Sequence, residues 1–219
     1  PQCGFSVAAA NLYSGGVISL GTLLSVFLST SDEAVLILLG HPGSGTVIGK
    51  LLLGKVLIGI LFGYLADLLL RRKKEEKHIE DLCRSCGCSD HGGIVMPALR
   101  HTIRLGLYLL LFTFILNLLL EWIGTDALTA FLGKDTWFQP LITALIGLIP
   151  NCASSILITE LYLAGGLSFA SAMAGLCAGA GVGLAVLFRE NRPMRENAGI
   201  LALLYGISAV TGLVLEIFL

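Results

Sequence analysis

Two adjacent carboxylates interrupt an apolar stretch of the sequence. Asp32 and Glu33 lie in the segment STSDEA, and Lys55 follows in the next apolar stretch. Carboxylates are costly within a lipid bilayer, so those found there are functional candidates. They could bind a cation or exchange protons for it. Alternatively, one of them pairs with Lys55 and the pair only neutralises both charges, so Lys55 is a candidate for ion pairing or for coupling.

Two short segments that combine a proline with a cysteine supply further candidate ligands. PQCGFS begins at residue 1, and the similar PNCASS begins at residue 150. The polar residues in and around these segments are Cys3, Asn11, Ser31, Asn151, Cys152, Glu160 and Cys177. Thiolates suit soft or borderline cations, whereas carboxylate and amide oxygens suit harder ones such as manganese, so the mixture leaves the ion open. Helix N-termini just after Cys3 and Cys152 could instead attract an anion, and each cysteine alone could be a small buried apolar residue.

A third cluster of candidate ligands is the segment CRSCGCSDHGG. It contains Cys83, Cys86, Cys88 and His91, and His78 and Asp90 could assist. Tetrahedral zinc sites use such ligands, often with a C-x-x-C start. The segment therefore predicts a loop that binds zinc or another metal, and the alternative is an exposed loop with incidental thiols.

The elements that carry these residues are predicted to be membrane-spanning helices. Of the 219 residues, 55% are hydrophobic and only 13% are charged, and the mean hydropathy is +0.87. A soluble domain keeps about a quarter of its residues charged, so this composition indicates a bilayer protein. The stretches with about the 20 residues that a span requires are 19–39, 47–70, 103–122, 167–188 and 197–219. Glycines spaced four apart, such as Gly59 and Gly63, should let these helices pack closely.

The basic loops predict how the helices are oriented. Lysines and arginines gather in RRKKEEKH from Arg71 and in RENRPMRE from Arg189, and such loops remain cytoplasmic. Loops 71–102 and 189–196 are therefore predicted to be cytoplasmic. The segment 141–166 must then enter and leave the membrane on the same side, as a re-entrant hairpin with its tip at PNC. The alternative is one full span kinked at the proline, which would place the second basic loop outside.

An internal repeat relates the two ends of the sequence. A shift of 149 positions places PQCGFS on PNCASS, and it places Asp67 on Glu216. Three crossings separate the copies, so they should be inverted relative to each other, as in many secondary transporters with broken helices. The predicted fold is an all-α integral membrane protein with inverted structural repeats and re-entrant helical hairpins that meet near the bilayer midplane.

The repeat also predicts how the chain is divided. Residues 1–70 form the first repeat, 71–102 form the cytoplasmic loop with the Cys/His cluster, and 103–219 form the second repeat. By comparison with the second repeat, the first lacks one hairpin arm and one preceding span. We therefore expect the first repeat to be incomplete at its N-terminus.

Three long segments of the sequence carry a resemblance to a known family. They are PQCGFSVAAANLYSGGVISLGTLLSVFLSTSDEA, CRSCGCSDHGGIVMPALRHTIR and LIPNCASSILITELYLAGGLSFASAMAGLCAGAGVGLAVLFREN. Together they resemble the putative ten-transmembrane heavy-metal exporter family, whose members are also labelled manganese transporters or arsenic efflux proteins. The resemblance covers nearly the whole chain. It implies a prokaryotic inner-membrane protein that exports a metal or metalloid.

We therefore predict a secondary transporter, not an enzyme, that exports a divalent heavy-metal ion or metalloid across the inner membrane. Asp32 and Glu33 would bind the ion or exchange protons for it, and the cytoplasmic cysteine loop would capture or sense metal. The expected partners are the ion and the lipid bilayer, a homo-oligomer is an open alternative, and no cofactor is required. The basic loops are explained by orientation, so binding to nucleic acid is not predicted.

Three other functions are compatible with the same residues. The chain could carry an anion or a small organic solute at the positive ends of its half-helices. It could be an intramembrane enzyme that uses the two carboxylates as an acid–base pair. It could also be a membrane metal sensor in which only the loop from Cys83 to His91 matters.

Overall fold

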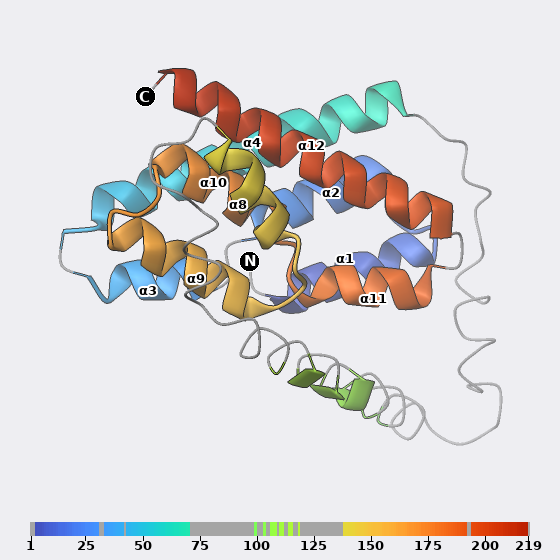
Figure 1. Ribbon diagram of the computed structural model, residues 1–219. Coiled ribbons are helices and arrows are strands. Elements are labelled where there is room, and N and C mark those ends of the chain that lie inside the picture. Colours follow the sequence, from blue (N-terminus) through green and yellow to red (C-terminus); the bar gives the residue numbers. More distant parts are fainter. Residues whose placement is uncertain are drawn as a thin grey trace, which may run out of the picture.

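The described part of the chain is entirely helical, as the sequence predicts. The structure, a computed structural model, describes residues 3–30, 33–41, 43–70, 138–191 and 194–218, with scattered residues between 99 and 118. Within these ranges the helices are α1 (Cys3–Ser14), α2 (Leu20–Ser29), α3 (Glu33–Leu39), α4 (Gly45–Leu69), α8 (Gln139–Gly147), α9 (Cys152–Leu163), α10 (Phe169–Ala178), α11 (Val182–Glu190) and α12 (Met194–Phe218) (Figure 1).

Four helical stretches are long and apolar enough to cross a membrane. Two are single helices, α4 and α12, and two are pairs of shorter helices, α2 with α3 and α10 with α11. The four predicted spans at 19–39, 47–70, 167–188 and 197–219 are thus found close to their expected bounds. The fifth, 103–122, lies mostly outside the described residues.

The two paired stretches are broken where the sequence analysis expected continuous helices. The first break follows α2 at Thr30, whose extended backbone ends the helix while its hydroxyl donates to the carbonyl of Val26 at 2.6 Å. The second break lies between α10 and α11, where Gly181 has a φ of 56° and a ψ of −148°. Only glycine adopts that backbone without strain, so the helix cannot continue through it.

Residues 141–166 are interrupted where the sequence predicts. Helix α8 ends at Gly147 and α9 begins at Cys152, with Pro150 in the turn between them. Proline disfavours a helical conformation in the residue before it, and Asn151 then caps α9 by accepting a hydrogen bond from the amide of Ala153 at 3.5 Å. The segment thus forms two short helices, as the hairpin prediction requires, and the re-entrant path itself remains a prediction.

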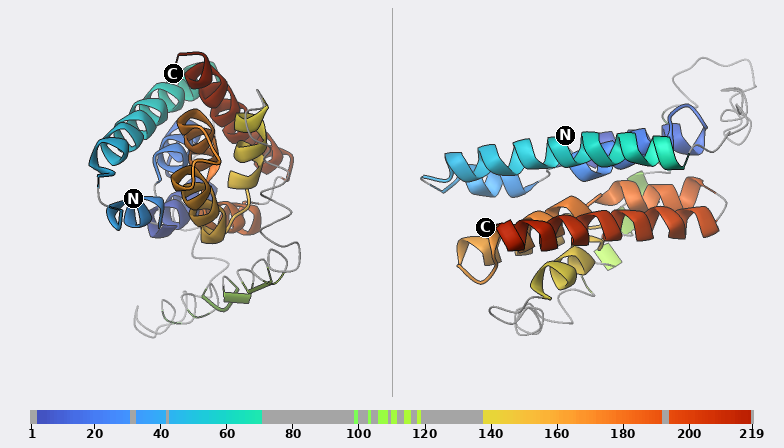
Figure 2. Two further views of the ribbon diagram at one scale, coloured as in Figure 1. Left: turned by 60° about the vertical axis from the view of Figure 1, so that its left-hand side comes forward. Right: turned by 90° about the horizontal axis from the view of Figure 1, so that it is seen from above.

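The helices repeat with the spacing found in the sequence. Adding 149 to the bounds of α1, α2 and α4 gives the bounds of α9, α10 and α12, and α11 begins 149 positions after α3. Helix α2 packs on α4 as α10 packs on α12, whereas α1 packs on α11 and α3 packs on α9 (Figure 1). Figure 2 shows that the long helices α4 and α12 run in opposite directions.

Each broken stretch is attached to its long helix by a carboxylate. Ser19 caps the N-terminus of α2 and donates to the Asp67 carboxylate at 2.6 Å, and Asp67 also accepts from the amide of Gly21 at 2.7 Å. Ser168 caps α10 and donates to the Glu216 carboxylate at 2.6 Å. Ser168 lies 149 positions after Ser19, and Glu216 lies 149 positions after Asp67. The same connection therefore occurs twice.

A double-mutant cycle should detect this connection. Ser168→Ala and Glu216→Ala each remove the same hydrogen bond, so their effects on stability in detergent should fall short of additivity by about 0.6 kcal/mol, and by at most about 1.7 kcal/mol. Ser168→Ala combined with Asp67→Asn, a carboxylate of the other connection, is the matched control and should be additive within about 0.5 kcal/mol. Full additivity of the first pair would show that the hydrogen bond contributes nothing.

The broken stretches lie inside the bundle and the long helices lie outside it. Within the apolar 18-residue core of each stretch, 89% of the residues are buried for α10 with α11 and 44% for α2 with α3, but only 28% for α4 and 33% for α12. The main apolar core contains Leu23, Leu24 and Phe27 of α2 together with Met173 of α10 and Leu187 of α11. Thr30 and Gly181, where the two helices are interrupted, are both buried, and irregular backbone is tolerated at membrane depth where protein surrounds it.

Candidate functional site

A buried lysine joins the two broken stretches. Lys55 lies in the middle of α4 and its side chain is 1% exposed. Its Nζ donates to the carbonyl oxygen of Thr30, at the end of α2, and to that of Leu176, in the last turn of α10, the latter at 2.6 Å. The C-terminal ends of α2 and α10 therefore meet at one ammonium group.

This arrangement is favourable because each group supplies what the other lacks. The last four carbonyls of a helix have no partner within it, and the C-terminal end carries the negative part of the helix dipole. A buried ammonium needs such acceptors, since an uncompensated buried charge costs several kcal/mol. Hydrogen bonds to charged groups contribute about 1.5–3 kcal/mol each, so Lys55 strongly stabilises this meeting of helix ends.

A carboxylate lies immediately after the first break. Glu33 is the first residue of α3 and is half-buried. Its Oε2 accepts a hydrogen bond of 3.4 Å from the hydroxyl of Ser155, which also lies 2.8 Å from the carbonyl oxygen of Cys152. The contact connects the start of α3, in the first repeat, with the first turn of α9, in the second.

The turn that begins α9 also carries a thiol and an amide. Asn151 is buried and caps the helix, and the carbonyl of Asn151 accepts from Ser154 Oγ at 2.8 Å. Cys152 follows with a half-buried thiol. The predicted candidates Asn151 and Cys152 thus lie in the turn that leads to Ser155, and Ser155 is the residue that contacts the third candidate, Glu33.

Ser155 is a site residue that the sequence analysis did not propose. The repeat could have indicated Ser155, because a serine occupies the corresponding position, Ser6, in the first copy. Ser6 lies against α11, where a side chain at Gly183 would come within 2.6 Å of the Ser6 Cβ. Ser155 thus contacts Glu33 of α3, and Ser6 lies against α11 at Gly183, one residue after the counterpart of Glu33.

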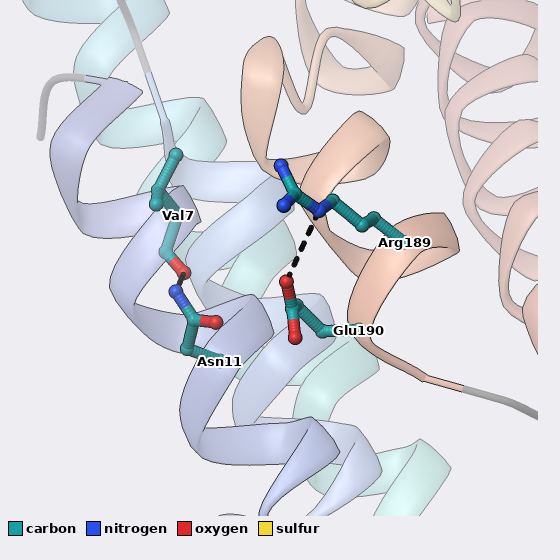
Figure 3. Close-up of polar contacts among 4 residues, drawn as sticks. All are labelled: Val7, Asn11, Arg189 and Glu190. Carbon is teal, nitrogen blue, oxygen red and sulfur yellow. Dashed lines mark hydrogen bonds and ion pairs between the residues drawn. The ribbon is translucent and has the colours of Figure 1, made fainter. Parts of the chain in front are cut away.

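Two other candidates lie further along their helices. Asn11 donates to the carbonyl of Val7, one turn earlier in α1, at 3.2 Å (Figure 3). Glu160 is exposed in the third turn of α9. Since Asn11 bonds within its own helix and Glu160 faces outward, the structure does not bring either to the contact between Glu33 and Ser155.

The side chains of the remaining predicted ligands are not among those that the structure describes. Cys3 starts α1, but its side chain is not described. Residues outside the described ranges are Ser31, Asp32, His78, Cys83, Cys86, Cys88, Asp90 and His91. The zinc-loop prediction and the pairing of Asp32 with Lys55 therefore remain predictions.

Polar contacts hold the second basic loop against the bundle. Arg189 and Glu190 form an ion pair of 3.4 Å at the end of α11, beside α1 (Figure 3), and the Arg189 guanidinium lies 4.4 Å from the centre of the Tyr108 ring. The Tyr13 hydroxyl donates to the Glu196 carboxylate in the first turn of α12. Of these contacts, the one between Tyr13 and Glu196 attaches α1 to the second basic loop.

The described residues alone do not complete a metal-binding cluster. Within the described ranges, no three His, Cys, Asp or Glu side chains gather closely enough to hold a metal ion. The described residues do place the Glu33 carboxylate against the Ser155 hydroxyl, and the Lys55 ammonium against the carbonyls of Thr30 and Leu176. The sequence places a second carboxylate, Asp32, next to Glu33.

Comparison with known proteins gives one finding. A family model described as "Putative, 10TM heavy-metal exporter" matches residues 105–219. No curated protein and no solved structure matches the chain. The matched residues include α8 to α12 and hence the turn with Cys152 and Ser155.

Proposed function

Because the chain belongs to the family of putative ten-transmembrane heavy-metal exporters, we propose that it is a secondary transporter that exports a divalent metal ion or a metalloid. Family membership and the apolar helices make it an integral membrane protein with a heavy metal as the expected substrate. We further propose that the substrate is of the manganese or arsenic type and that the protein lies in the inner membrane of a prokaryote.

The observation that carries the proposal is the carboxylate at the first helix break. Glu33 is half-buried in an apolar bundle and contacts Ser155, which lies three residues after Cys152 in the first turn of α9. Carboxylates at membrane depth mark ion pathways by default. Oxygen ligands together with a thiol suit borderline or hard divalent cations, and Asp32 would supply the second negative charge.

The architecture supports a transport mechanism with inverted repeats. The bounds of the repeated helices differ by 149 positions, and α4 and α12 run in opposite directions (Figure 2). Two broken stretches inside the bundle correspond to the discontinuous helices of secondary transporters, whose binding sites lie near the midplane. In this proposal α8 and α9 form a re-entrant hairpin, and loops 71–102 and 189–196 are cytoplasmic.

The residues would act in sequence. A metal ion from the cytoplasm would first meet the thiols of Cys83, Cys86 and Cys88. It would then bind between the start of α3 and the start of α9, where Asp32 and Glu33 neutralise its charge. Alternating exposure of this place to the two sides of the membrane would release the ion outside.

Elemental analysis of cells tests the proposal directly. Cells that express the full-length gene are challenged separately with manganese, zinc, cadmium and arsenite, beside cells with an empty vector. We expect the cell content of one element to fall in the expressing cells. If the content of every element equals that of the vector control, metal export is contradicted, and a carrier of anions or organic solutes becomes the better explanation.

A further inference from the structure

We propose that Lys55 couples metal export to proton entry, because its ammonium acts as an attached counter-cation that loses its proton when the metal ion binds. The inference rests on the proposed export of a divalent metal ion. It adds the coupling ion, the proton, and the residue that carries it.

The position of the ammonium indicates its role. Nζ binds carbonyl oxygens at the C-terminal ends of α2 and α10, the first halves of the two broken stretches. In transporters with broken helices, unwound carbonyls and half-helix C-termini bind the coupling cation. Here a covalently attached ammonium takes that place, so the cation that can enter and leave it is a proton.

The charged residues at the first helix break and at the middle of α4 have no charged counterparts in the second repeat. A shift of 149 positions places Lys55 on Leu204, which is fully buried, and places Asp32 and Glu33 on Gly181 and Val182. The second repeat thus forms the same helices without these three charges. The lysine therefore accompanies the carboxylates, as expected for a group that exchanges charge with them.

The ionisable groups around Lys55 can be named element by element. Helices α2, α3 and α10 pack against α4. Helix α2 has no ionisable side chain, α3 contributes Glu33 and α10 contributes the buried thiol of Cys177. On α4 itself, Lys50 and Tyr64 are exposed and Asp67 binds Ser19 at the far end. Asp32 precedes Glu33 in the sequence and is outside the described residues.

The proton step follows from charge balance. When a divalent ion binds the carboxylates from the cytoplasm, its charge repels the ammonium, and Lys55 transfers one proton to water, which gives a neutral amine and hydronium on the cytoplasmic side. Once the site opens outward, the amine takes a proton from external hydronium, which leaves water, and the metal ion departs. The neutral amine still has two N–H groups for the carbonyls of Thr30 and Leu176, so the helix ends stay together. One proton enters for each divalent ion exported.

The test uses purified full-length protein in liposomes that contain a pH-sensitive dye and a metal-sensitive dye. Mn²⁺, Zn²⁺ and Cd²⁺ are supplied separately. For the wild type, we expect a pH gradient to drive net metal movement, and a metal pulse to move protons the opposite way. Exchange of metal for metal across the membrane needs no proton and is measured in parallel.

Two variants separate coupling from structure. Lys55→Arg keeps a cation that cannot release its proton, and Lys55→Gln keeps an N–H donor without a charge. Both should lower proton-coupled net transport by about 100-fold or more, the lower end of what a positioned proton-transfer group contributes. Metal-for-metal exchange should persist in Lys55→Arg. The exposed Lys50→Gln on the same helix is the matched control and should behave as the wild type.

The outcomes distinguish the inference from the function on which it rests. If the wild type moves none of the three ions, metal export itself fails. If the wild type moves metal without protons, the inference is overturned while export stands, and this result needs no variant to fold. If Lys55→Arg moves protons as the wild type does, Lys55 only holds the helix ends, and the inference is also overturned.

Discussion

Replacing Glu33 by Gln should raise the metal concentration for half-maximal export by about 100-fold, because it removes a negative charge next to the bound ion. Taking one partner from a partly buried charge pair costs about 3 kcal/mol, and each 1.4 kcal/mol is about tenfold in affinity. The carboxylate lies at the start of α3 and accepts a hydrogen bond from Ser155. The measurement is the rate of metal uptake into inside-out membrane vesicles as a function of metal concentration.

A matched carboxylate elsewhere controls for charge alone. Glu190 is also half-buried, and it forms an ion pair with Arg189 away from the helix breaks (Figure 3). Glu190→Gln should therefore leave the half-maximal concentration within about twofold, since partly exposed ion pairs contribute only about 0–1 kcal/mol. Equal curves for Glu33→Gln and the wild type would exclude Glu33 as a ligand and would shift the binding role to Asp32 or to another site.

Replacing Gly63 by Ala should destabilise the protein by about 3 kcal/mol, because there is no room for a methyl group where α4 crosses α2. A Cβ at Gly63 would lie 1.8 Å from the Ser25 hydroxyl oxygen and 2.7 Å from the carbonyl oxygen of Gly21. Ser25 cannot easily turn away, since its hydroxyl donates to the Gly59 carbonyl at 2.8 Å. Overpacking of this kind typically costs about 1–3 kcal/mol, and the backbone contact puts this case at the upper end.

The same substitution on the same helix provides the control. Gly49 lies in the first turns of α4, is exposed, and has no atom within 4 Å of a Cβ built on it. Gly49→Ala should therefore be neutral or stabilising by up to about 1 kcal/mol, the helix propensity difference between the two residues. Thermal unfolding in detergent measures both variants. A Gly63→Ala protein as stable as Gly49→Ala would show that the two helices are further apart than described.

The sequence predicts much of the frame because the frame depends on strong local signals. Hydropathy locates α4 and α12 to within a few residues, and the proline in PNC locates the turn between α8 and α9. The repeat, read from a few matching letters, is reproduced in the helix bounds. The glycine spacing at Gly59 and Gly63 predicts close packing, and both glycines lie against α2.

The helix breaks and the partners of Lys55 could not be predicted in this way. At Thr30 and Gly181 the chain remains apolar enough to cross a membrane, so hydropathy does not register that the helix has ended. From charge alone, a carboxylate is the partner expected for Lys55. The structure adds two partners of another kind, the carbonyls of Thr30 and Leu176. Backbone carbonyls become available only when helices end next to each other, which depends on tertiary structure.

The exchange of short helices between the repeats has a mechanical consequence. Helix α1 of the first repeat packs on α11 of the second, and α9 of the second packs on α3 of the first (Figure 1). The two halves of the chain are therefore interlaced. Neither half can rotate as a rigid body unless the short helices of the other half that pack on it move as well. A sliding movement that opens the bundle on one side must therefore occur between two groups of helices. One group is α1, α3, α9 and α11, and the other is α2, α4, α10 and α12. The boundary between the groups divides each repeat.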